Sequence, residues 1–284
     1  MAQELIRPIL TVDVVILTLH QGRVQVVLQE RAKPPHTGRL AVVGGYVNPE
    51  EDSSTTAAAA RVLKGKTGLT ARVLEQLMTF SGPDRDDRGW SASVAYCALL
   101  PGEALQKRAD PSLKRLPFEK VKGLPFDHDD IVAKAVDRCR RRGVYSTLPA
   151  FLLEPTFTLS SLRLAYEAVL GRTLNDSAFR RKIDELRVIE PVPGAASKAT
   201  ARPAQLYRLS RNQVTEFDRT IRAVKLRNPP LASPKHRRRV DSRPSPRHAW
   251  RPADHSRRVR RDCPLPRSSP GEGIHAGGRS WRDA

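Results

Sequence analysis

Short runs of apolar and β-branched residues, separated by polar or glycine-containing turns, organise the first half of the chain. Residues 11–19 and 23–28 are two such runs, and the turn at Gly22 between them predicts a hairpin of two strands. The alanine-rich stretch 55–66, which stops near Gly68, predicts a helix. The first half of the chain is therefore expected to mix strands with helices.

The same kind of pattern continues downstream. A short strand is predicted at 40–43, and longer strands at 73–80 and 91–100, with a charged loop at 81–89 between them. An amphipathic helix with a basic end is predicted at 131–142. This order of elements favours an α+β fold in which a sheet lies inside an α/β/α sandwich.

After residue 145 the pattern changes to two helices followed by a hairpin. Residues 157–171 have a hydroxyl-bearing start, apolar residues at helical spacing and a glycine stop. Residues 179–186 form a basic helix whose apolar positions share one face. Two short strands follow, joined by a flexible loop at 194–202. Helix, turn, basic helix and hairpin together predict a winged helix-turn-helix.

Composition separates a last segment from the rest of the 284 residues. Segment 228–284 holds nine of the 23 prolines and few aliphatic residues in periodic order. It cannot bury enough apolar surface to offset the entropy of ordering, so it is predicted to be a disordered basic tail. We expect two domains, 1–145 and 146–227, before it. The tail could add nonspecific DNA affinity or be a nonfunctional extension.

Positive charge extends through the whole chain, which has a formal net charge of +20. The tail contains 14 of the 50 Lys and Arg residues and 5 of the 30 Asp and Glu residues, so an excess remains elsewhere. This excess favours an acidic partner such as nucleic acid, and a basic solvated surface is the alternative.

The cysteines and the apolar runs bear on the cellular compartment. Cys97, Cys139 and Cys263 form neither a disulfide framework nor a zinc pattern, which favours a reducing cytoplasm. No apolar run approaches the roughly 18 residues that a membrane span needs. The start of the chain lacks the features of a secretory signal. We therefore expect a cytoplasmic protein with no membrane partner.

The most specific motif runs from Gly44 to Gly68. It contains a glycine pair, acidic residues around Glu51, an alanine run and Arg61. This order resembles the Nudix box, in which glycine and glutamate precede Arg-Glu-x-x-Glu-Glu-x-Gly, with a longer spacer here. The resemblance implies a site for a nucleoside diphosphate compound. A plain loop before a helix is the alternative.

Three glutamates of that motif are replaced in this sequence, by Val62, Gly65 and Lys66. Carboxylates at this spacing share one helix face and hold Mg²⁺ or Mn²⁺, which neutralise the diphosphate and activate water. Valine and glycine offer no oxygen ligand, and a lysine repels a cation. We therefore expect ligand binding with little or no hydrolysis, no catalytic residue and no metal site. Lys66 could meet a diphosphate directly as a point charge.

Two further segments, 80–96 and 126–131, are similar to the branch of Nudix proteins that recognises ADP-ribose. For His128 an ordinary loop or capping role is the alternative, for Arg61 a structural ion pair, and for 84–87 a solvated turn. The predicted ligand-binding residues are Arg31, Gly44, Gly45, Glu51, Arg61, Lys66, Arg85 and His128.

The C-terminal module resembles that of the Nudix-related transcriptional regulators of NAD metabolism, the NrtR family. The likeness rests on residues 157–159, 166–171, 179–182 and 202–208, and together with the Nudix box it covers roughly 10–209. A recognition helix of this kind places its N-terminal half in the major groove. An exposed basic helix face that only meets solvent is the alternative. The predicted DNA-binding residues are Thr158, Ser160, Arg180, Arg181, Lys182, Lys198, Arg202 and Arg208.

The resemblance implies a homodimeric repressor of NAD metabolism genes. Its partners would be double-stranded operator DNA and ADP-ribose or a related nucleotide, which acts as an effector and not as a cofactor. One alternative is an active Nudix hydrolase of ADP-ribose, in which Glu50, Glu51 and loop 84–87 supply a displaced metal site. Another is an RNA-binding Nudix relative, although the wing suits duplex DNA better.

Overall fold

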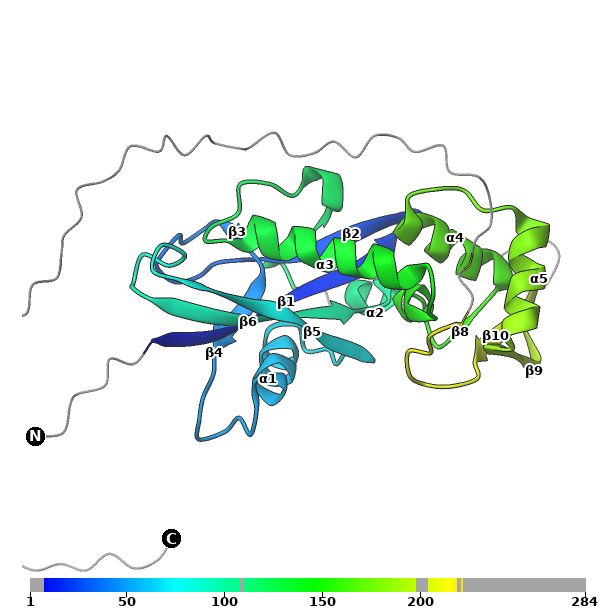
Figure 1. Cartoon of the computed structure of the whole chain (residues 1–284), viewed down its shortest axis with the longest axis horizontal. Coiled ribbons are helices and arrows are strands. Elements are labelled where there is room, and N and C mark those ends of the chain that lie inside the picture. Colours follow the sequence, from blue (N-terminus) through cyan, green and yellow to red (C-terminus); the bar gives the residue numbers. More distant parts are fainter. Residues whose placement is uncertain (1–7, 108–109, 198–203, 219–220, 222–284) are drawn as a thin grey trace, which may run out of the picture. The chain divides into compact units, whose positions relative to one another are not determined.

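The computed structural model describes residues 8–107, 110–197, 204–218 and 221, which all belong to one compact unit, Met1–Arg227. The segment 228–284, where the sequence predicts a disordered tail, lies outside the described residues. The described part combines a seven-stranded sheet with a three-stranded sheet (Figure 1). No helix in this part is long and apolar enough to cross a membrane.

Strand β1 (Ile9–His20) is the centre of the large sheet. It pairs in parallel with β6 (Ser91–Leu99) and antiparallel with β2 (Arg23–Glu30) and, nearer its start, with β4 (Val43–Tyr46). β5 (Val73–Gly82) pairs with the far side of β6. Seven consecutive residues of β1 are buried because both faces of the sheet are covered, which explains why this stretch is apolar apart from Asp13 and Thr18.

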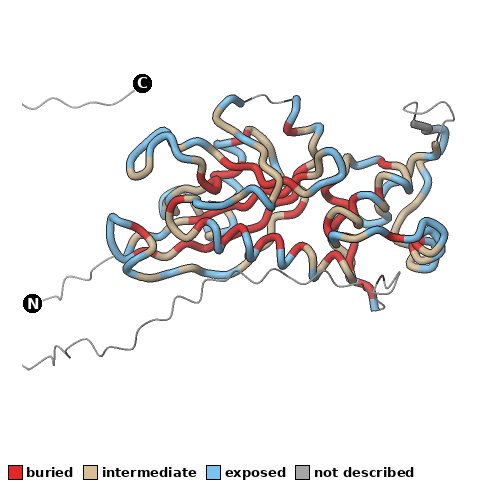
Figure 2. Tube along the Cα trace, turned by 90° about the horizontal axis from the view of Figure 1, so that it is seen from above, coloured by how far each residue is buried: buried red, intermediate tan, exposed pale blue. Residues whose placement is uncertain are grey.

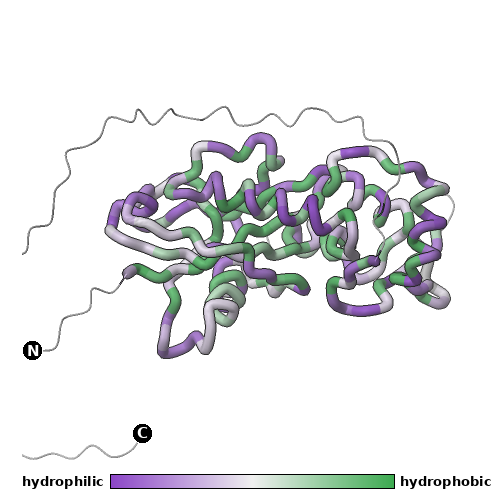
Figure 3. Tube along the Cα trace, viewed as in Figure 1, coloured by the Kyte–Doolittle hydropathy of each residue, from purple (hydrophilic) through white to green (hydrophobic). Residues whose placement is uncertain are grey.

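The two faces of the sheet are covered by different helices, α1 (Thr55–Thr67) and α3 (His128–Gly143) (Figure 1). Val14 and Ile16 of β1 pack in the cluster that contains α1, and Val15 and Leu17 pack in the cluster that contains α3. Figure 2 shows the buried residues concentrated in the strands and on the inward helix faces, and the hydropathy in Figure 3 follows the same division. The predicted α/β/α sandwich is confirmed.

The module after residue 145 is a winged helix. α4 (Leu159–Leu170) ends at Gly171, whose φ of 66° suits glycine, and α5 (Asp176–Leu186) follows after a short turn. β8 (Thr156–Phe157), β10 (Ala204–Leu209) and β9 (Ile189–Ser197) form the small sheet in that order. The predicted helix-turn-helix and hairpin are confirmed.

This module has an apolar core of its own. Tyr166 and Phe179 are each 1% exposed, and their rings meet edge to face at 5.5 Å. Burying an aromatic side chain of this size contributes roughly 1.5–3 kcal/mol. The 3₁₀ helix η2 (Leu148–Leu152) joins the two parts, because Phe151 packs on the α3 core while Ala150 packs on the winged-helix core.

Several elements differ from the sequence expectation. The predicted strand at 40–43 is divided into β3 (Leu40–Ala41) and β4, because the Val42 N–H donates to His128 and not to a neighbouring strand. The predicted flexible loop at 194–202 is wrong in its first part, since β9 continues to Ser197. The rest of that loop, 198–202, lies outside the described residues.

Short elements were missed altogether. The helix α2 (Gly102–Gln106), the strand β7 (Leu113–Pro117), the 3₁₀ helix η1 (Phe118–Lys120) and the strand β8 have five residues or fewer. At this length the side-chain pattern does not distinguish a strand or helix from a loop. β7 forms because it pairs with β2, a long-range contact that the local pattern does not reveal.

Candidate functional site

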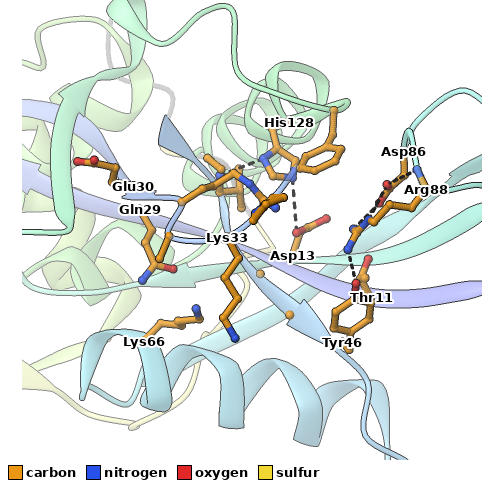
Figure 4. Close-up of a pocket in the computed structure, with 18 of the residues that line it drawn as sticks. Thr11, Asp13, Gln29, Glu30, Lys33, Tyr46, Lys66, Asp86, Arg88 and His128 are labelled. Carbon is orange, nitrogen blue, oxygen red and sulfur yellow. Dashed lines mark hydrogen bonds and ion pairs between the residues drawn. The ribbon is translucent and has the colours of Figure 1, made fainter. Parts of the chain in front are cut away.

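A cavity of about 420 Å³ lies against the large sheet, between the loop that follows β2, the glycine pair of β4, the end of α1 and the segment before α3 (Figure 4). Two of the eight predicted ligand residues, Glu51 and Arg61, do not line it. The cavity does bring together the other six, which are Arg31, Gly44, Gly45, Lys66, Arg85 and His128.

Arg61 instead holds the loop before α1. Its guanidinium donates to both carboxylate oxygens of Asp52, at 2.7 and 2.6 Å, and to the Tyr46 carbonyl at 3.0 Å. The hydrogen bonds from Arg61 lower the pKa of Asp52 to about 2. Glu51 lies 3.7 Å from the Arg61 Nε and is largely exposed. In this structure Arg61 thus forms the structural ion pair that the sequence analysis gave as the alternative to ligand binding.

The two glycines of β4 are required by close packing on both sides of that strand. A Cβ on Gly44 would overlap Oδ1 of Asp13 and lie 3.1 Å from the Val12 carbonyl oxygen. A Cβ on Gly45 would lie 2.9 Å from Cγ2 of Val62. Any larger residue at either position would displace the floor of the cavity.

A buried polar network, part of which lines the cavity, lies next to these glycines. Asp13 accepts a hydrogen bond from Ser93 at 2.6 Å and lies 3.6 Å from Arg85. Arg85 donates to both carboxylate oxygens of Asp127 at 2.9 Å. The Arg85 side chain is 8% exposed, as is that of Asp13. Each buried charge thus has an opposite charge beside it, as burial in a low-dielectric interior requires.

His128 completes this network as a neutral group. Its Nδ1 accepts the Val42 N–H at 3.1 Å, so the ring proton belongs on Nε2, which lies 3.6 Å from Oδ1 of Asp13. Burial lowers the pKa of His128. His128 therefore fixes the start of α3 to the point where β3 and β4 separate.

Aromatic rings support two of the cavity's arginines. The Arg31 guanidinium stacks over Phe126 at 4.9 Å, and burial lowers its pKa. The Arg88 guanidinium lies over Tyr46 at 5.4 Å and also donates to the Tyr46 hydroxyl. Such contacts are worth about 0.5–2 kcal/mol each. They hold both guanidinium groups in fixed orientations.

Sequence reasoning missed several residues that line the cavity. Asp13 did carry a signal, because it is the one charged residue in the apolar run 11–19. A buried carboxylate needs a partner, so this position predicts a polar site. Lys33 gave no comparable signal, because it lies in a polar loop outside the motifs. The remaining missed residues lie within segments that resemble the Nudix family but were not chosen there: Tyr46, Asp86, Arg88 and Phe126.

At the three positions where the Nudix box has helix glutamates, α1 carries Val62, Gly65 and Lys66. Val62 is 5% exposed and packs in the α1 core beneath Gly45. Gly65 has no side chain, and Lys66 presents an ammonium group. In the part of the chain that the structure describes, no group of three His, Cys, Asp or Glu side chains is arranged to hold a metal ion. Valine, glycine and lysine supply none of the oxygen ligands that a hard cation takes.

The predicted DNA-binding face is built on α5, which carries three basic and three acidic side chains. Arg180 pairs with Asp176 at 3.0 Å and Lys182 pairs with Glu185 at 2.9 Å. Arg181 is exposed and, among the described residues, has no ion pair. Because α5 has three basic and three acidic side chains, its net charge is zero. Among the described residues Arg181 is the basic side chain of α5 that has no acidic partner.

The remaining predicted DNA contacts are placed unevenly. Thr158 caps α4, and its hydroxyl accepts the Ser161 N–H at 3.0 Å, while Ser160 is exposed on the first turn. Arg208 of the wing pairs with Glu190 at 2.6 Å. Lys198 and Arg202 lie outside the described residues.

Comparison with known protein families agrees with this architecture. A model described as the NUDIX domain matches residues 8–139, and one described as the NrtR DNA-binding winged helix domain matches residues 149–209. The first range contains every residue that lines the cavity, and the second contains α4, α5 and the wing.

Individual relatives share one domain or both. An ADP-ribose pyrophosphatase of Methanocaldococcus jannaschii is 32% identical over 111 residues, which are 38% of this chain and 63% of that protein. A crystal structure of Shewanella oneidensis NrtR complexed with a 27mer DNA has a TM-score of 0.66 and 32% identity, covering 70% of this chain and 93% of that one.

A curated relative covers both domains. The ADPR responsive transcriptional repressor NtrR of Acinetobacter baylyi is 37% identical over 207 residues, which are 72% of this chain and 82% of that protein. With both domain models matched in the same order, the chain belongs to the NrtR family of Nudix and winged-helix proteins.

Proposed function

We propose that this chain is a transcriptional repressor whose Nudix cavity binds ADP-ribose or a related nucleotide and whose winged helix binds operator DNA. The observation that carries the proposal is the 37% identity to an ADPR responsive transcriptional repressor, which runs through both domains. The related Shewanella oneidensis protein was crystallised with a DNA duplex. Domain limits of 1–145 and 146–227 and a homodimer belong to this proposal.

The chemistry of the cavity supports an anionic nucleotide as the ligand. Basic side chains surround it, and aromatic rings of Tyr46 and Phe126 line two of its sides. A nucleoside diphosphate compound offers the negative charge of its phosphates to the basic side chains. Its flat base suits the aromatic rings. The volume of about 420 Å³ lies within the range of about 300–1,000 Å³ that is typical of small-molecule sites.

The residues at the Nudix-box glutamate positions support binding with little or no hydrolysis. Val62 is part of the apolar core, and Lys66 lines the cavity with a positive charge. A divalent cation would meet no carboxylate at these positions and would be repelled by the ammonium group. These three positions therefore provide no ligand for the metal ion that activates the attacking water in metal-dependent hydrolases.

A physical connection between cavity and winged helix runs along α3. The helix begins at His128, which lines the cavity, and its last turn contains Arg142. Arg142 pairs with Glu75 of β5 and, at 2.9 Å, with Glu216, which follows the wing. A ligand that favours one position of α3 would change the geometry of the DNA-binding part, provided that it binds the two states with different affinity.

The test is a gel shift with the full chain and its own upstream duplex, titrated with ADP-ribose. The same samples are then assayed for AMP and ribose 5-phosphate. We expect a shifted band that changes with ADP-ribose while the ADP-ribose stays intact. If no upstream duplex is shifted by the protein, the proposed repressor function is contradicted.

A second candidate is an ADP-ribose hydrolase whose winged helix serves another purpose. The 32% identity of the Nudix part to an ADP-ribose pyrophosphatase favours it. It predicts product formation with Mg²⁺ or Mn²⁺ at ordinary enzyme rates, whether or not DNA is bound. The product assay above separates the two candidates.

A further inference from the structure

Five basic side chains line the cavity: Arg31, Lys33, Lys66, Arg85 and Arg88. We propose that Lys33 and Lys66 together bind the ligand's diphosphate directly, in place of divalent cations. This inference rests on the proposed function, because it takes a nucleoside diphosphate compound as the ligand. It makes ligand binding independent of metal.

The three arginines are already committed to protein groups. Arg85 is held by both oxygens of Asp127 and by the Ser91 hydroxyl at 3.1 Å. Arg88 donates to both oxygens of Asp86, at 2.8 and 2.6 Å. A diphosphate that recruited either guanidinium would have to break a two-point charged contact that is among the stronger hydrogen-bonded pairs in proteins.

Arg31 is committed in a different way. Its Nε donates to the Pro35 carbonyl at 2.8 Å, and its guanidinium plane covers the Phe126 ring. Within the described residues no hydrogen bond uses its other guanidinium N–H groups, but its position is set by the ring and the loop. We therefore assign to Arg31 a supporting role at the edge of the cavity.

Lys33 and Lys66 have no such commitments. Within the described part of the chain neither ammonium group forms an ion pair or a side-chain hydrogen bond. Lys33 comes from the loop after β2 and Lys66 from the last turn of α1, and Figure 4 shows both side chains reaching into the same part of the cavity.

The carboxylates of the cavity do not neutralise this pair. Asp13 and Asp86 are held by Arg85 and Arg88. The carboxylate of Glu30 points away from both lysines in Figure 4. The local field is therefore positive and favours an anion.

A diphosphate ester carries about two negative charges at neutral pH, one on each phosphate, so two ammonium groups match it. A lysine ammonium is a compact charge with three rotatable donors and adapts to phosphate oxygens without a fixed geometry. Lys66 stands at a position where the Nudix box has a metal-binding glutamate, so its ammonium lies where that motif requires a cation. The site thus keeps a positive charge at this position, but a lysine supplies it in place of a metal ion.

Lys66 has a competing structural explanation. Lys64 and Lys66 both lie in the last turn of α1, where a positive charge stabilises the helix dipole. Lys64 does not line the cavity. It therefore provides a matched control that loses the same helix interaction and no ligand contact.

The experiment is isothermal titration of ADP-ribose into the full chain, in EDTA and in excess Mg²⁺. For the wild type we expect equal affinity in the two buffers. Lys33→Met and Lys66→Met should each weaken binding about tenfold, and the double variant about a hundredfold, because each removes one charge-assisted contact. Lys64→Met should bind like the wild type.

Two readouts separate this inference from a folding defect and from a failure of the proposed function. The thermal midpoints of Lys64→Met and Lys66→Met should agree, because both lose the same helix interaction. Wild-type binding that disappears in EDTA, or Lys66→Met that binds as tightly as Lys64→Met, would overturn the two-lysine site while leaving the ADP-ribose sensor intact. No binding of ADP-ribose by the wild type in either buffer would overturn the proposed function, and this inference with it.

Discussion

The same chemical pair, an arginine with a carboxylate, occurs in two regions of this protein and serves each region differently. In the lining of the ligand cavity, the side chains of Arg85 and Asp13 are both 8% exposed. On the α5 face, Arg180 and Asp176 are 51% and 53% exposed. Arg85 also pairs with Asp127 at 2.9 Å, close to the 3.0 Å between Arg180 and Asp176, so solvent exposure and not bond length distinguishes the two regions.

Exposure decides what each pair can do. Breaking one side of a buried pair leaves an unpaired charge in a low dielectric and costs about 3–5 kcal/mol. An exposed pair contributes about 0–1 kcal/mol, because water and salt compensate for its loss. The cavity pairs therefore fix a scaffold, whereas the α5 pairs can open and exchange their partners for DNA phosphates at little cost.

The largest expected effect is on stability. Arg85→Ala should lower the free energy of unfolding by about 3–5 kcal/mol, because it strands Asp127 and Asp13. Arg180→Ala, which breaks the exposed pair, should change it by less than about 1 kcal/mol. Urea denaturation of both variants without ligand or DNA measures the contrast. Equal losses would mean that burial does not separate the two regions.

A second contrast tests the floor of the cavity. Gly44→Ala should destabilise the fold by about 1–3 kcal/mol and weaken ADP-ribose binding, because the new Cβ overlaps Asp13. Gly65→Ala meets nothing within 4 Å and should stabilise α1 by about 0.5–1 kcal/mol. Thermal unfolding and ligand titration of both variants should show effects of opposite sign on stability. A neutral Gly44→Ala would show that the floor can relax.

A third contrast lies within α5. Arg181→Ala should weaken binding to the operator about tenfold, because Arg181 reaches DNA without first leaving a partner. Arg180→Ala should weaken it by roughly threefold, because part of that charge is already balanced by Asp176. Fluorescence anisotropy with a labelled operator duplex measures both. The reverse order would show that α5 is presented to DNA in another orientation.

The smallest expected effect is a pH dependence that arises in the buried network. Burial holds the folded-state pKa of His128 below its ordinary value of 6.5, so between the two values the unfolded chain binds the additional proton. Stability should therefore be complete above about pH 6.5 and should fall as the pH drops below it. The lowered pKa values of Asp52 and Asp86 act only below 3.8, outside this window.

Chemical denaturation of the wild type and of His128→Asn between pH 7.5 and 5 tests this effect. Asparagine retains an acceptor for the Val42 N–H but does not titrate, so the variant should lose the His128 part of the slope. The same slope in both proteins would place its origin in another group.

Local pattern was sufficient for the long elements. The run around β1, the alanine-rich α1 and the two helices of the winged helix all carry a full period of apolar positions, so their positions could be predicted. β7 could not, because five residues become a strand only through pairing with β2. Short elements are fixed by tertiary contacts that the local sequence does not record.

The ligand site was only partly predictable for the same reason. Gly44, Gly45 and Lys66 lie in one continuous motif and reach the cavity together. Arg61 belongs to that motif too, but Asp52 holds it outside the cavity. The network of Asp13, Arg85 and His128 joins three distant segments, and no spacing rule connects them.

The most direct test of the account is whether the cavity and the winged helix influence each other. Calorimetry measures the affinity of the full chain for ADP-ribose, alone and when saturated with operator duplex, and anisotropy measures the operator affinity with and without ADP-ribose. The account predicts that ADP-ribose changes operator affinity, and that the operator changes ADP-ribose affinity by the same factor, with the nucleotide intact throughout. Identical ADP-ribose affinities in the free and DNA-bound protein would contradict it.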